Sequence, residues 1–129
     1  MDRKQWRLKI KRACDKAGTY RDYFLPVIET LSGILEKRDA AQQLYDEGGG
    51  VLTTEHTNKG GATNVEVAPL VRLINDLNRD ALQYWRDLGL TPAGLKKIND
   101  SMAKKVEEQS ELAKALEKLG GEQALEGCP

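Results

Sequence analysis

The residues best suited to chemistry in this chain are Lys and Arg side chains concentrated at its beginning. Residues 1–21 carry eight Lys or Arg against two Asp, although the 129 residues as a whole hold 20 basic and 20 acidic side chains. Dense positive charge neutralises phosphates, and such binding depends strongly on salt and little on base sequence. We therefore predict DNA binding by the seven basic residues of the first segment: Arg3, Lys4, Arg7, Lys9, Lys11, Arg12 and Lys16.

The same basic segment has a second interpretation. A short amphipathic helix covered with charge also keeps a protein soluble, or docks on an acidic partner. Trp6 lies among the basic residues, where an indole ring could stack on nucleic acid or pack against the rest of the chain. A helix this short is marginally stable in water, so we expect it to fold against the body of the protein or against a polyanion.

The other reactive residues do not form a catalytic or metal-binding pattern. His56 is the only histidine and has no identifiable nucleophile or carboxylate partner. The run Gly48 to Gly50 ends a helix instead of following a strand, so it is not a phosphate-binding loop. Cys14 and Cys128 have the spacing of neither a disulfide framework nor a zinc site. We predict no catalytic residue, no metal and no cofactor, and hence a protein that is not an enzyme.

The helices expected between Val67 and Ile98 organise the chain. Alternating spacings of four and three residues relate Leu70, Ile74, Leu77, Ala81, Tyr84 and Leu88, which form one stripe on a helix. Gly89 is suited to a left-handed C-terminal cap. Thr91 and Pro92 then start a new helix, because a hydroxyl caps a helix well and proline is tolerated in the first turn. The two helices should meet at a tight corner.

Upstream of this corner, residues 20–47 show a second helical stripe. Pro26 requires that the regular helix starts only a few residues before it, or that the first turn is kinked. Gly33 in mid-helix indicates close approach of a neighbour.

Residues 51–57 and 62–65 are expected to pair as a small β-hairpin, because they flank a turn-forming sequence. Downstream, the helical spacing extends to about Leu119, where two glycines are expected to stop the helix.

These observations predict a mostly α protein with a long antiparallel helical hairpin, a small β-hairpin at its tip, a basic N-terminal helix and a C-terminal helix. The expected boundaries are 1–19 for the basic segment, 20–90 for the helical hairpin with the β-hairpin at 51–65, 91–121 for the C-terminal helix and 122–129 for a flexible tail. No apolar run is long enough to span a bilayer, and no signal peptide follows Met1. We therefore expect a cytosolic protein without a membrane partner.

The corner Gly89-Leu90-Thr91-Pro92 carries a resemblance to a known family. It follows a long helix, which is preceded by a Gly-rich hairpin containing Lys59-Gly60 and by a helix containing Asp39. Over residues 20–100 this order resembles the small-subunit family of phage terminases, in the branch with a Gly-Leu-Thr-Pro corner near the C-terminal end. The chain has Leu95 where that family usually has arginine, and Asn64-Val65 where it usually has Asn-Pro.

The resemblance implies a non-catalytic DNA-packaging protein of the host cytoplasm. Small terminase subunits assemble as rings, recognise double-stranded viral DNA and bring it to the terminase large subunit. A ring of identical copies would also cover apolar stripes too long for one small core. The predicted oligomerisation residues are Val27, Leu31, Ile34, Leu70, Ile74, Leu77, Tyr84 and Leu88. The acidic C-terminal region would then be offered to the large subunit.

Two alternatives remain open at this stage. A dimeric DNA-binding regulator would protect two half-sites on a palindrome. A structural adaptor of a virion would show no salt-dependent DNA affinity.

Overall fold

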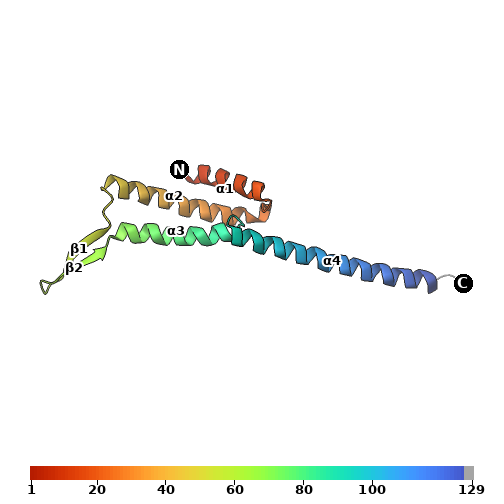
Figure 1. Cartoon of the computed structure of the whole chain (residues 1–129). Helices are drawn as coiled ribbons and strands as arrows, with labels where there is room; N and C mark the ends of the chain where they lie inside the picture. The colour runs from red at the N-terminus through yellow and green to blue at the C-terminus, as the bar shows by residue number, and fades with distance from the viewer. Residues whose placement is uncertain (127–129) are drawn as a thin grey trace.

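The computed structural model describes residues 1–126, and the side chains of residues 1–120. Four α-helices, one 3₁₀ turn and one β-hairpin make up the described chain (Figure 1). Their bounds are α1 Arg3–Ala17, the turn η1 Asp22–Phe24, α2 Leu25–Glu47, β1 Thr53–Thr57, β2 Thr63–Val67, α3 Pro69–Asp87 and α4 Pro92–Glu126. The predicted mostly α fold with a helical hairpin and a β-hairpin at its tip is confirmed.

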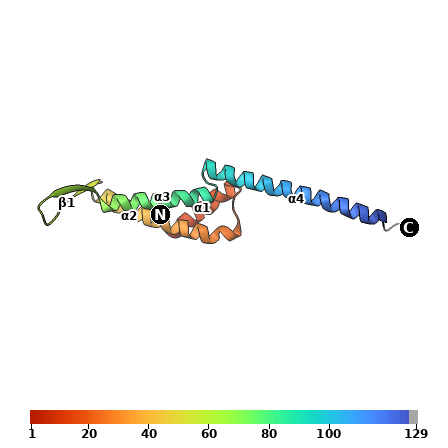
Figure 2. The ribbon, with the colours of Figure 1, turned by 90° about the horizontal axis from the view of Figure 1, so that it is seen from below.

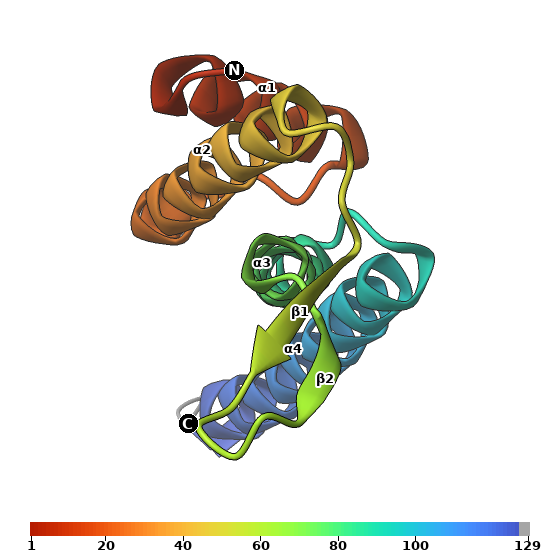
Figure 3. The same cartoon turned by 90° about the vertical axis from the view of Figure 1, so that its left-hand side faces the viewer.

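Helices α2 and α3 lie antiparallel, and α1 lies against α2 (Figures 1 and 3). The core is formed where these helices meet, from Trp6, Ile10, Cys14, Ile28, Leu31, Leu35, Ala81 and Leu88. Burying one large aliphatic or aromatic side chain contributes about 1.5–3 kcal/mol. Helix α1 supplies three of these eight residues, so the core depends on α1 as well as on the helical hairpin.

Helix α2 begins later than residue 20. Pro26 lies in its first turn, and the 3₁₀ turn η1 connects it to the preceding loop. The regular helix thus starts just before Pro26, as the first of the two predicted arrangements has it. Proline is tolerated there because N–H groups of the first turn have no intrahelical partner in any case.

The β-hairpin pairs Thr53 with Val67 and Thr57 with Thr63 in antiparallel register. Its turn is closed by Asn58, whose Oδ1 accepts hydrogen bonds from the backbone of Gly60 and Ala62, both at 3.1 Å. The second strand ends two residues later than residue 65. All residues from 51 to 67 are exposed, and the hairpin extends from one end of the helical pair (Figure 1).

The corner between α3 and α4 has the caps that the sequence predicts. Gly89 adopts a φ of 73°, and the Oγ1 of Thr91 accepts a hydrogen bond from the N–H of Gly94 at 3.1 Å. A Cβ at Gly89 would lie 2.8 Å from both Ile98 and Thr19 side-chain atoms, and a Cβ at Gly94 would overlap the carbonyl oxygen of Arg86. Both glycines therefore allow the two helices to approach closely.

Helix α4 points away from the other helices at the end opposite the β-hairpin (Figures 1 and 2). It continues through Gly120 and Gly121 to Glu126, so the helix end predicted near Leu119 is wrong. Glycine weakens a helix by about 1 kcal/mol but can adopt helical dihedrals. Residues 122–126 of the predicted flexible tail continue the helix, and 127–129 lie outside the described residues. Among the described helices, none has an apolar stretch sufficient to cross a membrane.

Candidate nucleic-acid interface

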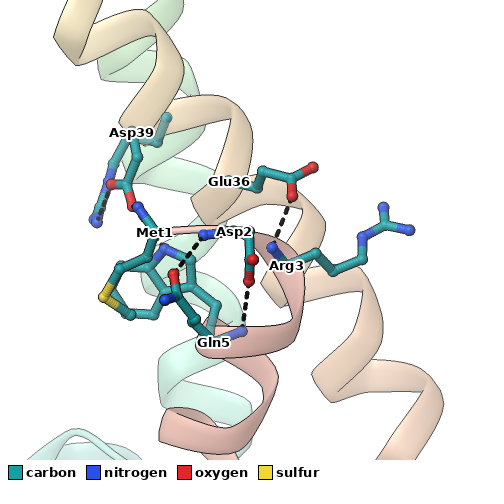
Figure 4. Close-up of polar contacts among 8 residues, drawn as sticks. Met1, Asp2, Arg3, Gln5, Glu36 and Asp39 are labelled. Atoms are coloured by element: carbon teal, nitrogen blue, oxygen red, sulfur yellow. Dashed lines mark hydrogen bonds and ion pairs between the residues drawn. The ribbon is translucent and has the colours of Figure 1, made fainter.

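Helix α1 carries the predicted DNA-binding residues, and both of its ends are capped. The carboxylate of Asp2 accepts a hydrogen bond from the backbone of Gln5 at 2.8 Å, and the Gln5 side chain accepts one from the backbone of Asp2 at 3.0 Å (Figure 4). At the other end, Gly18 has a φ of 73° and Thr19 donates to the carbonyl of Cys14 at 3.0 Å. Capping of this kind stabilises a helix that is marginal alone.

The inner face of α1 is docked on the body of the protein. Trp6 is 8% exposed, and Ile10 and Cys14 are fully buried. The Trp6 ring meets Trp85 edge to face, with 6.5 Å between ring centroids. Of the two interpretations of Trp6, packing is therefore the one found in the structure, and its ring is not available to stack on bases. Burial also raises the pKa of the Cys14 thiol.

Asp39 of α2 anchors the beginning of α1. Its Oδ2 accepts hydrogen bonds from the Trp6 indole N–H at 2.7 Å and from the N-terminal ammonium of Met1 at 3.2 Å (Figure 4). Its Oδ1 accepts one from Arg38 at 3.0 Å. Burial would raise the pKa of the Asp39 carboxyl, but these hydrogen bonds and the Arg38 charge outweigh burial and hold that pKa below its ordinary value. The carboxylate therefore helps to hold α1 on α2.

Two of the seven predicted DNA-binding residues face α2. Arg3 and Arg7 both pair with Glu29, at 3.8 and 3.3 Å. The Arg3 guanidinium lies over Gly33, where a Cβ would come within 2.5 Å of it. The close approach predicted at Gly33 is thus made by a side chain. Because the one carboxylate of Glu29 is shared by Arg3 and Arg7, we expect these two residues to contribute less to phosphate binding than the sequence indicates.

The outer face of α1 holds the other five: Lys4, Lys9, Lys11, Arg12 and Lys16. Lys9 and Lys11 lie over the rings of Trp6 and Tyr20, at 5.1 and 5.2 Å from the centroids. No carboxylate among the described side chains lies within 4.0 Å of any of these five residues.

Lys9, Arg12 and Lys16 form a row on that outer face. They are three and four residues apart, so one helical face presents all three over a length of about 10 Å. Together with Gln5, Leu8 and Ala13 they line a shallow hollow. The row can accept a phosphate backbone without moving α1 from the core.

The predicted oligomerisation residues pack largely within one chain. Leu31, Ile74 and Leu88 are buried in the single chain, and the other five are half-buried: Val27, Ile34, Leu70, Leu77 and Tyr84. The stripes of α2 and α3 face each other, so a role of these residues between copies stays a prediction. The spacing of the apolar residues could not show that they pack within one chain, because a stripe that faces its own partner helix has the same spacing as one that faces another copy.

The remaining sequence candidates lie apart from one another. His56 is exposed on β1, and Cys14 is buried on the inner face of α1. Within the described residues no group of three or more His, Cys, Asp or Glu side chains is placed to hold a metal ion.

The comparison with protein families agrees with this geometry. The model of a family described as phage terminase, small subunit, matches residues 3–105. The match begins with α1 and ends within α4, so it includes the basic helix, the helical hairpin and the corner. No curated protein and no solved structure matches the chain.

Proposed function

Since the chain belongs to the phage terminase small-subunit family, we propose that it binds viral DNA and delivers it to the terminase large subunit as a non-catalytic homo-oligomer in the host cytoplasm. The observation that supports DNA binding best is the outer face of α1. Its five cations have no compensating carboxylate among the described side chains, and the helix that presents them is fixed by a buried face and two caps.

We expect α1 to contact the phosphate backbone. The cations of the outer face are Lys and Arg on a helix surface, and Trp6, the one large aromatic of α1, is buried beneath them. Backbone contacts position a protein on DNA and carry no sequence information directly. Any recognition of a particular site would then come from several α1 helices placed around one DNA by the oligomer.

The proposal is tested by the salt dependence of DNA binding. Each phosphate contact lowers the slope of log K against log salt by about 0.9. Replacing Lys9, Arg12 and Lys16 by Gln should therefore make the slope shallower by about 2–3, measured by fluorescence anisotropy with duplex DNA. The matched control is Lys104→Gln/Lys114→Gln/Lys118→Gln, which removes three charges from α4. An unchanged slope in the α1 variant would exclude the row of Lys9, Arg12 and Lys16 as the phosphate contact.

A further inference from the structure

A groove at the corner of α3 and α4 has no role in the proposed function. It has a volume of about 700 Å³ and is lined by apolar atoms of Ala93, Ile98 and Met102. Its cationic lining residues are Arg86, Lys97 and Lys105. The groove exists because Gly94 lets the first turn of α4 sit on the Arg86 carbonyl, after which α4 diverges from α3.

The cations of this groove have no ionic partner in their own chain. Among the side chains that the structure describes, no carboxylate lies within 4.0 Å of Arg86, Lys97 or Lys105. One carboxylate, that of Asp87, also lines the groove. The groove therefore combines an apolar floor with an excess of positive charge, which fits a ligand that is both apolar and acidic.

The middle of α4 has that chemistry. Residues 92–105 contain four Lys and one Asp, whereas residues 106–112 contain three Glu and no basic residue. In this acidic segment Val106 and Leu112 are 66% and 62% exposed. Glu107, Glu108 and Glu111 have no cation within 4.0 Å among the described side chains. Helix α4 thus contributes both to the basic groove and to a segment, residues 106–112, with acidic and apolar side chains. Both are exposed in the single chain.

The acidic segment cannot occupy the groove of its own chain. Both lie on the same straight helix, with their centres about 15 Å apart along its axis. Helix α4 projects away from the body (Figure 2). Lys97, Met102 and Lys105 of the groove and all residues of the acidic segment are exposed, so both are accessible to a neighbour. The opposite charges of the two segments match one copy of α4 to another.

We propose that the groove of one chain binds residues 106–112 of α4 from a second copy. The apolar contact joins Leu112 of the second copy to Ile98 and Met102. Glu108 lies four residues before Leu112 and three before Glu111, so these glutamates share a side of the helix with Leu112 and meet the cations of the rim. This inference rests on the homo-oligomeric part of the proposed function. It assigns the middle of α4 to assembly and leaves the end of the chain for the large subunit.

A charge-swap experiment tests the proposal, with molar mass read by light scattering after size exclusion. Lys97→Glu/Lys105→Glu and Glu108→Lys/Glu111→Lys should each reduce the mass at least twofold at a concentration where the unaltered protein is assembled. The quadruple variant, and an equimolar mixture of the two double variants, should regain the mass. The control Lys114→Glu/Lys118→Glu changes the charge of α4 outside the groove and should leave the mass unchanged. Circular dichroism confirms that each variant is helical.

Two outcomes would overturn the inference. If both double variants keep the unaltered mass, the groove does not bind residues 106–112 of a second copy. If they lose mass but the quadruple variant and the mixture do not regain it, the contact is not between these two segments. The salt slope of DNA binding through α1, measured on the same samples, tests the proposed DNA binding separately, because α1 and the groove share no residue.

Discussion

Asp39 is one of the residues of α2 that fix the beginning of α1. It receives hydrogen bonds from the Trp6 indole, the N-terminal ammonium and Arg38. A hydrogen bond to a charged group contributes about 1.5–3 kcal/mol, and more is lost when a buried partner is left unsatisfied. Replacement of this carboxylate by an amide affects the docking of the entire helix, because it removes the charge and leaves one acceptor oxygen in place of two for these three donors.

We expect Asp39→Asn to lower the free energy of unfolding by about 1–3 kcal/mol at pH 7. The pKa of the Asp39 carboxyl is lower in the folded protein than its ordinary value of 3.8. Its contribution is therefore fully present above that value and is lost as the pH falls through the folded pKa. Urea unfolding at pH 7 and between pH 5 and 3 measures both effects. The exposed Asp46→Asn serves as control, and equal losses in the two variants would contradict the anchoring role.

The docking of α1 can be followed through Cys14, which lies on the buried face of this helix. The thiol is fully buried and burial raises its pKa, so the reactive thiolate is scarce and shielded. In a Cys128→Ser background we expect Cys14 to react with a thiol reagent only when α1 opens, at least about tenfold more slowly than an exposed cysteine. Leu8→Cys/Cys14→Ser in the same background provides the exposed reference, because Leu8 is 52% exposed. Equal rates would show that α1 is not held on α2.

The corner between α3 and α4 depends on a glycine that the cap pattern does not single out. Gly94→Ala would force its methyl group against the Arg86 carbonyl, and overpacking of this kind costs about 1–3 kcal/mol. Gly120→Ala places the same methyl group in open space on α4 and should raise helicity, because alanine is favoured in helices by about 1 kcal/mol. Thermal unfolding and circular dichroism distinguish the two. A Gly94→Ala protein as stable as the original would show that the corner can move.

Elements with local signals could be predicted from the sequence, and those that depend on tertiary contacts could not. The caps at Gly89 and Thr91 follow from residue type, since few residues adopt a positive φ or cap a helix through a hydroxyl. The compensation of Arg3 and Arg7 by Glu29 could not be predicted, because that carboxylate is on another helix. The end of α4 predicted near Leu119 was wrong, because glycine lowers the stability of a helix but does not prevent the helix from continuing.

In the molecule as a whole, several large apolar side chains of α3 and α4 remain exposed in the single chain. Leu73 and Leu82 on α3 are 47% and 49% exposed, and Leu116 and Leu119 on α4 are 61% and 58% exposed. Every residue from 99 to 120 is exposed in the single chain. Exposed apolar side chains in such a series mark interaction surfaces, and identical copies related by a closed symmetry can cover them on every chain. The protomer therefore supports the proposal of a homo-oligomer.

We expect the unaltered protein to show a discrete mass of many subunits that persists on dilution, measured by light scattering. Deleting residues 122–129 should leave that mass unchanged, because the uncovered apolar residues lie before them. The same deletion should weaken binding to the large subunit at least tenfold, measured by titration of the purified subunit, because it removes acidic residues at the end of the chain. A matched variant with Glu122 and Glu126 replaced by Gln shows whether weaker binding to the large subunit comes from the lost charge or from the shorter chain. Loss of mass on deletion would instead place the end of the chain in the assembly, and a monomer or dimer of the unaltered protein would contradict a ring.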